Sequence, residues 1–232
     1  MPDHREIYRL EPERYDEFVR CEDRQGNLLA CLRRLVPLQG SDVVELGAGT
    51  GRVTGLLSPQ VRSIRAFDAA APMLEVARRR LERLETGNWL LAVADNACLP
   101  VPDGSADLAV AGWTFGHQTM WDPGGWRAPV DAAIGEMLRV LRPGGTALVF
   151  ETLGPGHEVP FTPPAALGRY YARLADPHRF EWTWIRTDFE FASPAEGERL
   201  LRFFFGDELA RAFVRSGRSV LPGCTGVWWR RR

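Results

Sequence analysis

Hydrophobic residues in the middle of the chain follow two alternating spacings. Short, nearly continuous apolar runs are separated by longer segments in which apolar positions recur every third or fourth residue. The first pattern is typical of strands buried on both sides, and the second of amphipathic helices. The clearest helix is predicted from Pro129 to Leu141, before Arg142-Pro143-Gly144-Gly145 ends it. This alternation predicts a doubly wound α/β fold, with helices on both faces of a parallel sheet.

The predicted elements divide at residue 152, after which Gly and Pro residues become frequent. Five strands are expected before that point, over residues 42–46, 64–67, 89–93, 107–111 and 146–150. After it we expect, in order, a loop over 154–164, a helix over 165–175, a strand over 181–191, a helix over 194–216 and a strand over 220–230. Gly206 is expected to interrupt the second helix, and Pro222-Gly223 to mark a bulge or edge in the last strand.

Length and charge narrow the class of protein. The 232 residues suit one domain, and the formal net charge is −1. Such a chain lacks the basic field on which nucleic-acid binding depends, so no nucleic-acid partner is expected. Every basic residue is an arginine. The absence of lysine excludes Schiff-base catalysis and the Gly-Lys-Ser/Thr phosphate loop.

Cysteine usage and hydropathy favour a cytoplasmic protein. The N-terminus is charged and has no apolar run, so no secretory signal is expected. No segment approaches the ~18 consecutive apolar residues of a membrane span, so no membrane partner is expected. The four cysteines form neither a CxxC pair nor a His/Cys cluster. We therefore expect neither disulfides nor a bound metal.

The strongest chemical signal is a glycine-rich turn between the first strand and the next helix. Its sequence is Glu45-Leu46-Gly47-Ala48-Gly49-Thr50-Gly51. Glycines let the backbone turn tightly and approach a ligand closely. The dinucleotide fingerprint G-x-G-x-x-G requires a further glycine at position 52, where this chain has Arg52. A nicotinamide-dependent oxidoreductase is therefore disfavoured.

Two carboxylates follow the next two strands. Asp68 ends the second strand, where a carboxylate beside the glycine turn can accept both hydroxyls of a ribose. It can equally cap the following helix. Asp95 follows the third strand and can accept the exocyclic amine of an adenine, although alone it would be read as a loop acid.

Together these residues resemble the class I S-adenosylmethionine-dependent methyltransferases, most closely the ubiquinone/menaquinone-biosynthesis-like branch that acts on small molecules. The matching segments are VVELGAGTGRVT, AFDAAAPMLEVARRR, VADNACLPVPDGSADLAVAG and MLRVLRPGGTALVFE, within roughly residues 15–152. The resemblance implies a seven-stranded sheet of order 3-2-1-4-5-7-6 whose last strand is antiparallel. The segments 181–191 and 220–230 would be its sixth and seventh strands.

The resemblance also implies which residues bind S-adenosylmethionine. They are Tyr15, Glu45, Gly47, Gly49, Gly51, Asp68, Met73, Asp95, Asn96, Ala97 and Gly112. Glu45 would reach the amino group of the cofactor, Asp68 the ribose and Met73 the adenine face. Packing between helices is an equally weighted role for Tyr15. The single domain 1–232 would then comprise a helical cover (1–40), a cofactor-binding core (41–152) and an aromatic-rich acceptor-side cap with the last strands (153–232).

The methyl acceptor is expected beyond the fourth strand, in the crevice of an open sheet. Trp113, Phe115 and Trp121 are the predicted acceptor wall, although core packing is their alternative. His117 is the predicted catalytic residue, as a general base, because an unperturbed imidazole titrates near neutral pH. It could instead line the pocket or hydrogen-bond a loop. Glu151 is the second candidate for the base.

The sequence thus predicts methyl transfer from S-adenosylmethionine to a small apolar or aromatic acceptor. One alternative is a methyltransferase acting on a protein or RNA, for which Arg230-Arg231-Arg232 is the only support. The other is a cofactor-binding protein without activity. The oligomeric state, the acceptor and the methylated atom are left open.

Overall fold

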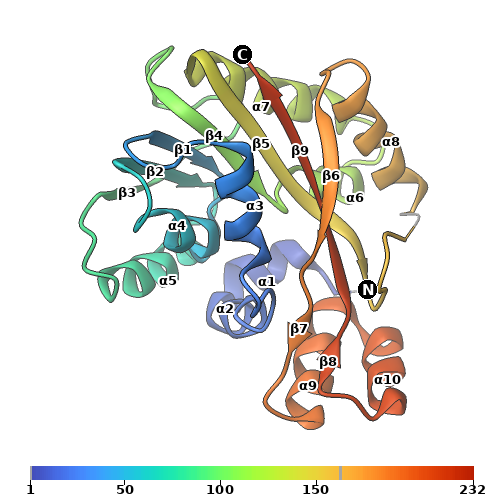
Figure 1. Ribbon diagram of the computed structural model, residues 1–232. Helices are drawn as coiled ribbons and strands as arrows, with labels where there is room; N and C mark the ends of the chain where they lie inside the picture. Colours follow the sequence, from blue (N-terminus) through green and yellow to red (C-terminus); the bar gives the residue numbers. More distant parts are fainter. Residues whose placement is uncertain (1, 162–163) are drawn as a thin grey trace.

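A computed structural model describes residues 2–161 and 164–232, and these form a seven-stranded sheet as their central layer (Figure 1). Its order is β3-β2-β1-β4-β5-β9-β6, and β9 runs antiparallel to both of its neighbours. The predicted order and the antiparallel last strand are therefore confirmed. The strands are β1 (Asp42–Leu46), β2 (Ser63–Asp68), β3 (Trp89–Val93), β4 (Ala106–Gly112), β5 (Leu141–Pro155), β6 (Glu181–Arg186) and β9 (Gly223–Arg231).

Two predicted strands are each broken in the structure. The segment predicted as 181–191 divides into β6 and the short β7 (Phe189–Glu190), and the segment predicted as 220–230 divides into β8 (Val220–Leu221) and β9. β7 pairs with β8 in a separate two-stranded sheet. Pro222 has no N–H to donate, which explains the second break. At the first break, the Asp188 carboxylate accepts the N–H of Gly223 at 3.0 Å, and the next two residues pair with β8 in place of β9.

Helices cover both faces of the sheet and bury separate cores, as predicted. On one face, α7 (Arg127–Val140) and α8 (Ala165–Ala175) cover a core that includes Ile134 and Tyr170. On the other, α3 (Asn27–Leu35) and α4 (Arg52–Leu57) cover a core that includes Leu32 and Leu57. α5 (Ala71–Glu82) packs beside β2 and β3. Residues 162 and 163 of the predicted loop 154–164 lie outside the described residues.

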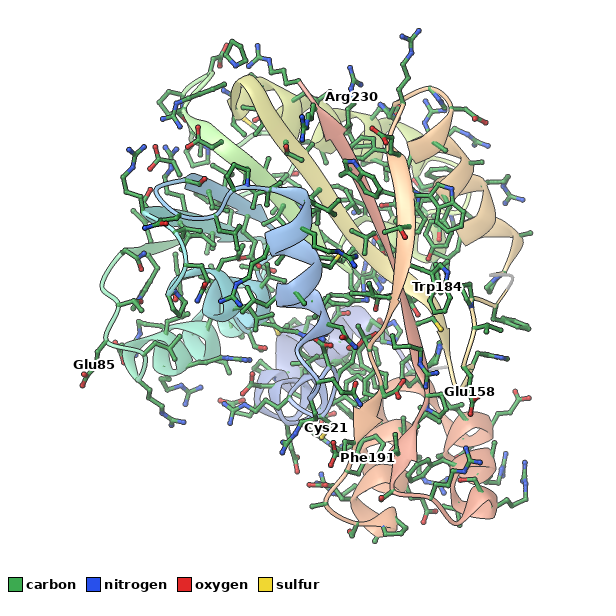
Figure 2. All side chains as sticks on the ribbon, in the orientation of Figure 1. Cys21, Glu85, Glu158, Trp184, Phe191 and Arg230 are labelled. Carbon is green, nitrogen blue, oxygen red and sulfur yellow. The ribbon has the colours of Figure 1, made fainter. Side chains whose placement is uncertain are left out.

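The two ends of the chain build a third core below the sheet (Figure 1). α1 (His4–Leu10) and α2 (Pro12–Val19) meet α9 (Pro194–Phe205), which is followed by α10 (Asp207–Ser216). Gly206 separates the last two helices, as predicted, at φ +89°. The backbone N–H of Glu190 also donates to the carbonyl of Cys21 at 2.8 Å, so Cys21 and Phe191 lie close together (Figure 2). Helix α2 of the predicted cover thus packs with α9 and α10 of the predicted elaboration, whereas α3 and α8 pack against the sheet.

No helix among residues 2–161 and 164–232 is long and apolar enough to cross a membrane.

Candidate cofactor and acceptor site

A cavity of about 250 Å³ opens at the carboxyl ends of β1, β2 and β4. Parallel α/β sheets place ligands at this edge because the loops that follow the strands converge there. Most of the predicted site residues line the cavity together: Tyr15, Gly47, Gly49, Asp68, Met73, Asp95, Asn96, Ala97, Gly112, Trp113, Phe115, His117 and Trp121. The structure thus brings most of the predicted cofactor residues and the predicted acceptor wall to one place.

The glycine turn is shaped by close contacts and by left-handed backbone. Gly47 has φ +67°, and a Cβ there would lie 2.9 Å from the Cβ of Thr114 while overlapping the rest of that side chain. The Thr114 hydroxyl in turn donates to the carbonyl of Gly112 at 3.0 Å, at the end of β4. Gly47 is therefore required so that the turn after β1 and the end of β4 can approach each other.

Asp68 ties the turn to the end of β2. Its two carboxylate oxygens accept the backbone N–H groups of Gly49 and Ala70, each at 2.8 Å. Burial raises the pKa of this carboxyl, while the two backbone donors act in the opposite direction. A carboxylate has about four acceptor positions, so two remain for hydroxyl groups in the cavity. Of the two roles weighed from the sequence, the helix cap is not found, because Ala70 is the N-cap of α5 and receives no capping bond from a side chain among the described residues. The two free acceptor positions remain compatible with a ribose.

The loop after β3 supplies further acceptors. Asp95 accepts the backbone N–H of Ala97 at 2.9 Å, which fixes the turn. The Oδ1 atom of Asn96 is buried, and it has no hydrogen-bond partner within the described part of the chain. Because a buried polar atom without a partner is unfavourable, this oxygen is suited to a donor on a bound molecule.

Two predicted cofactor residues do not reach the cavity wall. Glu45 lies buried beneath the turn, where it accepts the hydroxyl of Thr54 at 2.6 Å. Burial raises the pKa of this carboxyl to about 8. Gly51 faces α5 instead, and a Cβ there would lie 3.0 Å from the Cβ of Ala77. The structure gives both residues a role in supporting the turn.

Aromatic rings close the other end of the cavity. The Trp121 and His117 rings stack at 5.3 Å, and the Tyr8 ring stands edge-on to His117 and to Tyr15. The Tyr8 hydroxyl lies 2.8 Å from Nε2 of His117. Burial and the neighbouring His4 lower the pKa of His117 to about 3, so its ring is neutral at physiological pH. Sequence reasoning missed Tyr8, because no local motif marks a residue that reaches the site from α1.

Glu151 lies behind the aromatic wall and not in the cavity. Its carboxylate is buried and accepts the backbone N–H of Gly116 at 2.9 Å and the hydroxyl of Tyr170 at 3.1 Å. Burial raises its pKa to about 7. Glu151 therefore holds the turn that carries Phe115 and His117.

We expect Glu151 to make the stability of the fold dependent on pH. Between about pH 4.5 and pH 7 the unfolded chain ionises this carboxyl while the folded chain keeps it protonated. The contribution of Glu151 to the free energy of unfolding should therefore fall as the pH rises through this range and level off above it. Glu45, with a pKa of about 8, adds a fall of the same sign that continues to higher pH in all of the proteins compared. The Glu151→Gln variant should show a shallower fall in urea titrations at several pH values, whereas Glu181→Gln, at an exposed position, should keep the wild-type slope. Identical slopes in all three proteins would contradict the assignment.

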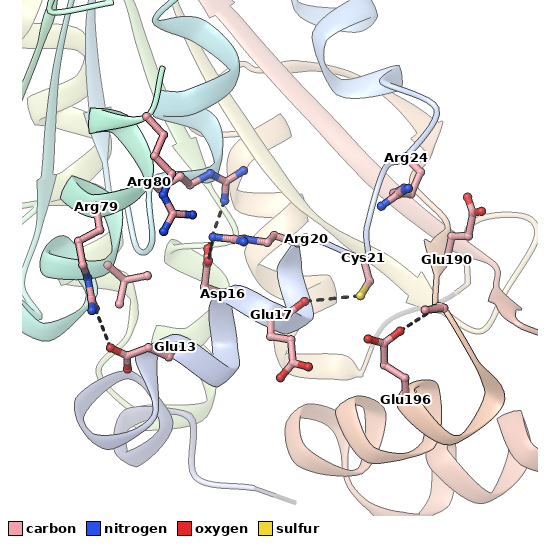
Figure 3. A pocket seen from close by; sticks show the side chains of 13 residues that line it. Glu13, Asp16, Glu17, Arg20, Cys21, Arg24, Arg79, Arg80, Glu190 and Glu196 are labelled. Carbon is pink, nitrogen blue, oxygen red and sulfur yellow. Dashed lines mark hydrogen bonds and ion pairs between the residues drawn. The ribbon is translucent and has the colours of Figure 1, made fainter. Parts of the chain in front are cut away.

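A second and larger opening, of about 500 Å³, lies between α2 and α5 (Figure 3). Arginines and carboxylates line it in pairs: Arg79 with Glu13 at 2.6 Å, and Arg20 and Arg80 with Asp16 at 2.5 and 3.2 Å. The pairs of Arg79 with Glu13 and of Arg80 with Asp16 join the two helices, whereas Arg20 and Asp16 pair within α2 and its C-cap. The smaller cavity at the strand ends is the one that combines a glycine turn with unpartnered acceptors.

Residues 44–149 match the family model described as a methyltransferase domain. The chain is 32% identical over 154 residues to a demethylmenaquinone methyltransferase of Clavibacter sepedonicus, covering 61% of this chain and 57% of that protein. It is 37% identical over 144 residues to a malonyl-[acyl-carrier protein] O-methyltransferase of Methylococcus capsulatus, covering 60% and 47%. The chain thus spans about half the length of the curated relatives it matches. Residues 44–149 are thus similar to a methyltransferase domain, and both of these relatives are methyltransferases by name.

The same fold is seen in a solved structure. An S-adenosylmethionine-dependent methyltransferase from Aquifex aeolicus superposes with a TM-score of 0.54 at 16% identity, covering 98% of this chain and 93% of that one. Low identity with a shared fold is expected when the sheet is retained and the loops vary.

The residues around the cavity fit S-adenosylmethionine, the cofactor that the sequence resemblance implies. Free carboxylate positions on Asp68 suit the ribose hydroxyls, and the orphaned Oδ1 of Asn96 suits an amino group. Met73 is buried and lies near Gly49, where a flat adenine ring could pack. Among the described residues, no group of three or more His, Cys, Asp or Glu side chains could hold a metal ion.

Proposed function

We propose that this protein transfers the methyl group of S-adenosylmethionine to a small apolar or aromatic acceptor. The observation that carries the proposal is the single cavity in which the Asp68 carboxylate and the glycine turn face a wall of aromatic rings. Gly47, Gly49, Asp68 and Asn96 would hold the cofactor at one end. Trp113, Phe115, His117 and Trp121 would enclose the acceptor at the other.

The chemistry requires little of the protein beyond positioning. When bound, the cofactor supplies an electrophilic methyl group on a positively charged sulfur. The aromatic rings exclude water from the acceptor, and their faces favour positive charge nearby. Holding the acceptor in line with the methyl group converts a bimolecular reaction into an effectively unimolecular one.

The relatives give two acceptor classes to compare. One is named for demethylmenaquinone and the other for a malonyl group on a carrier protein. The neutral, ring-lined wall supports a free aromatic or apolar acceptor as the first candidate. An acceptor carried on a protein is the second candidate, favoured by the second relative's name.

The proposal is tested by measuring S-adenosylhomocysteine release with a panel of small phenols, quinols, apolar acids and carrier-bound thioesters. We expect release with a small aromatic or apolar acceptor, and loss of that release in Asp68→Ala. Calorimetry should show binding of S-adenosylhomocysteine and no binding of NADH. Tight cofactor binding without release across the whole panel would favour a protein that binds the cofactor without catalysis.

We further infer a cytoplasmic setting and no nucleic-acid partner. Cys21, Cys31, Cys98 and Cys224 are all free thiols, which suits a reducing compartment. With a net charge of −1, we expect no retention on RNA at low salt.

A further inference from the structure

His117 has one ring nitrogen in a hydrogen bond and one without a partner. Nε2 lies 2.8 Å from the hydroxyl of Tyr8. Nδ1 is buried and has no hydrogen-bond partner among the described residues, although the ring lines the cavity. A buried polar atom of this kind is unfavourable unless something completes it, so the free nitrogen indicates where a ligand atom belongs.

The partner of Nε2 determines which nitrogen carries the proton. A phenol hydroxyl is a good donor, and within the described residues the Tyr8 oxygen has no partner other than His117. If Nε2 donated instead, the tyrosine hydrogen would itself be left without an acceptor. Tyr8 therefore donates to Nε2, and the hydrogen of the neutral ring lies on Nδ1.

The surroundings keep this ring neutral and fixed in position. The Trp121 ring stacks on it, and the His4 ring approaches edge-on at 5.3 Å. His4 is itself anchored, because its Nε2 donates to the carbonyl of Phe204 in α9 at 3.0 Å. The low pKa of His117 agrees with burial among these groups, and so low a value makes the ring a weak proton acceptor at neutral pH.

We propose that Nδ1–H of His117 donates a hydrogen bond to an oxygen of the methyl acceptor, and that Tyr8 is the positioning residue that fixes this tautomer. The acceptor class is then an apolar or aromatic molecule bearing a carbonyl, enol or phenol oxygen. An acceptor without such an oxygen leaves a buried donor unpaired. The acceptor identity rests on the proposed function, whereas the tautomer does not.

The tautomer is tested first, on the protein without ligands. Nitrogen-15 NMR distinguishes the protonated from the unprotonated ring nitrogen, and His117→Gln identifies which signals belong to this residue. In the wild type we expect hydrogen on Nδ1, and in Tyr8→Phe a shift of the population toward hydrogen on Nε2. Tyr15→Phe, which removes a hydroxyl from the same cavity without touching His117, should keep the wild-type signals. Hydrogen on Nε2 in the wild type would overturn the proposal.

The acceptor class is tested with two probes of the same shape. We expect 2-naphthol to bind about fivefold more tightly than naphthalene in the presence of S-adenosylhomocysteine, the usual effect of one neutral hydrogen bond. His117→Phe should abolish this difference while retaining naphthalene binding, and Tyr8→Phe should reduce it. Equal affinities in the wild type, or no binding of either probe, would overturn the acceptor class. Because neither test measures methyl transfer, a failure here is distinguishable from failure of the proposed function.

Discussion

Replacing Asp68 with alanine should weaken S-adenosylhomocysteine binding by about 3 kcal/mol, or roughly 150-fold. The carboxylate holds the N–H groups of Gly49 and Ala70 and keeps two further acceptor positions for the ribose. Its loss therefore removes ligand hydrogen bonds and at the same time releases the turn that shapes the pocket. Isothermal titration calorimetry on the folded variant measures the effect.

A matched control separates this effect from general destabilisation. Asp107 also accepts a backbone N–H, that of Asp42 at 2.8 Å, but it does so at the amino ends of β1 and β4, away from the cavity. Asp107→Ala should therefore lower the free energy of unfolding while leaving the affinity for S-adenosylhomocysteine near that of the wild type. If Asp68→Ala folds and binds as tightly as the wild type, the ribose is held elsewhere.

The cofactor half of the cavity could be predicted because its residues are marked locally. Asp68 is the last residue of β2, Asp95 lies two residues past the end of β3, and parallel strands bring their carboxyl ends to one edge of the sheet. Knowing the order of the strands and the positions of the loops that follow them is then enough to predict that these residues lie together. The same reasoning placed Trp113 and His117 in the crevice, since they follow the fourth strand.

The aromatic half of the cavity depends on contacts between distant parts of the chain, which no local sequence pattern predicts. Tyr8 reaches His117 because α1 packs against α2 and α5, and because His4 holds α1 to α9 through the carbonyl of Phe204. The break between β6 and β7 has the same origin, since Asp188 is drawn to the backbone of Gly223. Alternating residues around 181–191 fit one strand equally well, so periodicity could not locate the break.

Arg52 has a structural role that the sequence did not indicate. Its presence argued against a dinucleotide site, but its structural role was not foreseen. The guanidinium lies 4.3 Å from the centre of the Trp113 ring and forms an ion pair with Glu22 at 2.6 Å. Trp113 has φ +52°, a strained conformation for a residue with a side chain. Stacking against Arg52 helps to keep this ring at the cavity wall.

We expect Gly47→Ala to lower the free energy of unfolding by about 3 kcal/mol and to abolish measurable cofactor binding. An added methyl group would meet the Thr114 side chain, and the backbone is held at φ +67°. Gly87→Ala is the matched control, because its φ is +65° and a Cβ there has no neighbour within 4 Å. That control should show the conformational penalty alone, about 1 kcal/mol.

A double-mutant cycle assigns the remaining 2 kcal/mol or so to the close approach between Gly47 and Thr114. Removing the hydroxyl and methyl groups in Thr114→Ala leaves only its Cβ, which would lie 2.9 Å from the new methyl group at position 47. Gly47→Ala combined with Thr114→Ala should therefore recover part of the lost stability in urea denaturation. Additive effects of the two substitutions, or equal effects of Gly47→Ala and Gly87→Ala, would show that the turn and the end of β4 can separate without loss. Any loss of cofactor binding in Gly47→Ala would then come from contact between the new methyl group and the ligand, and not from a change in the protein.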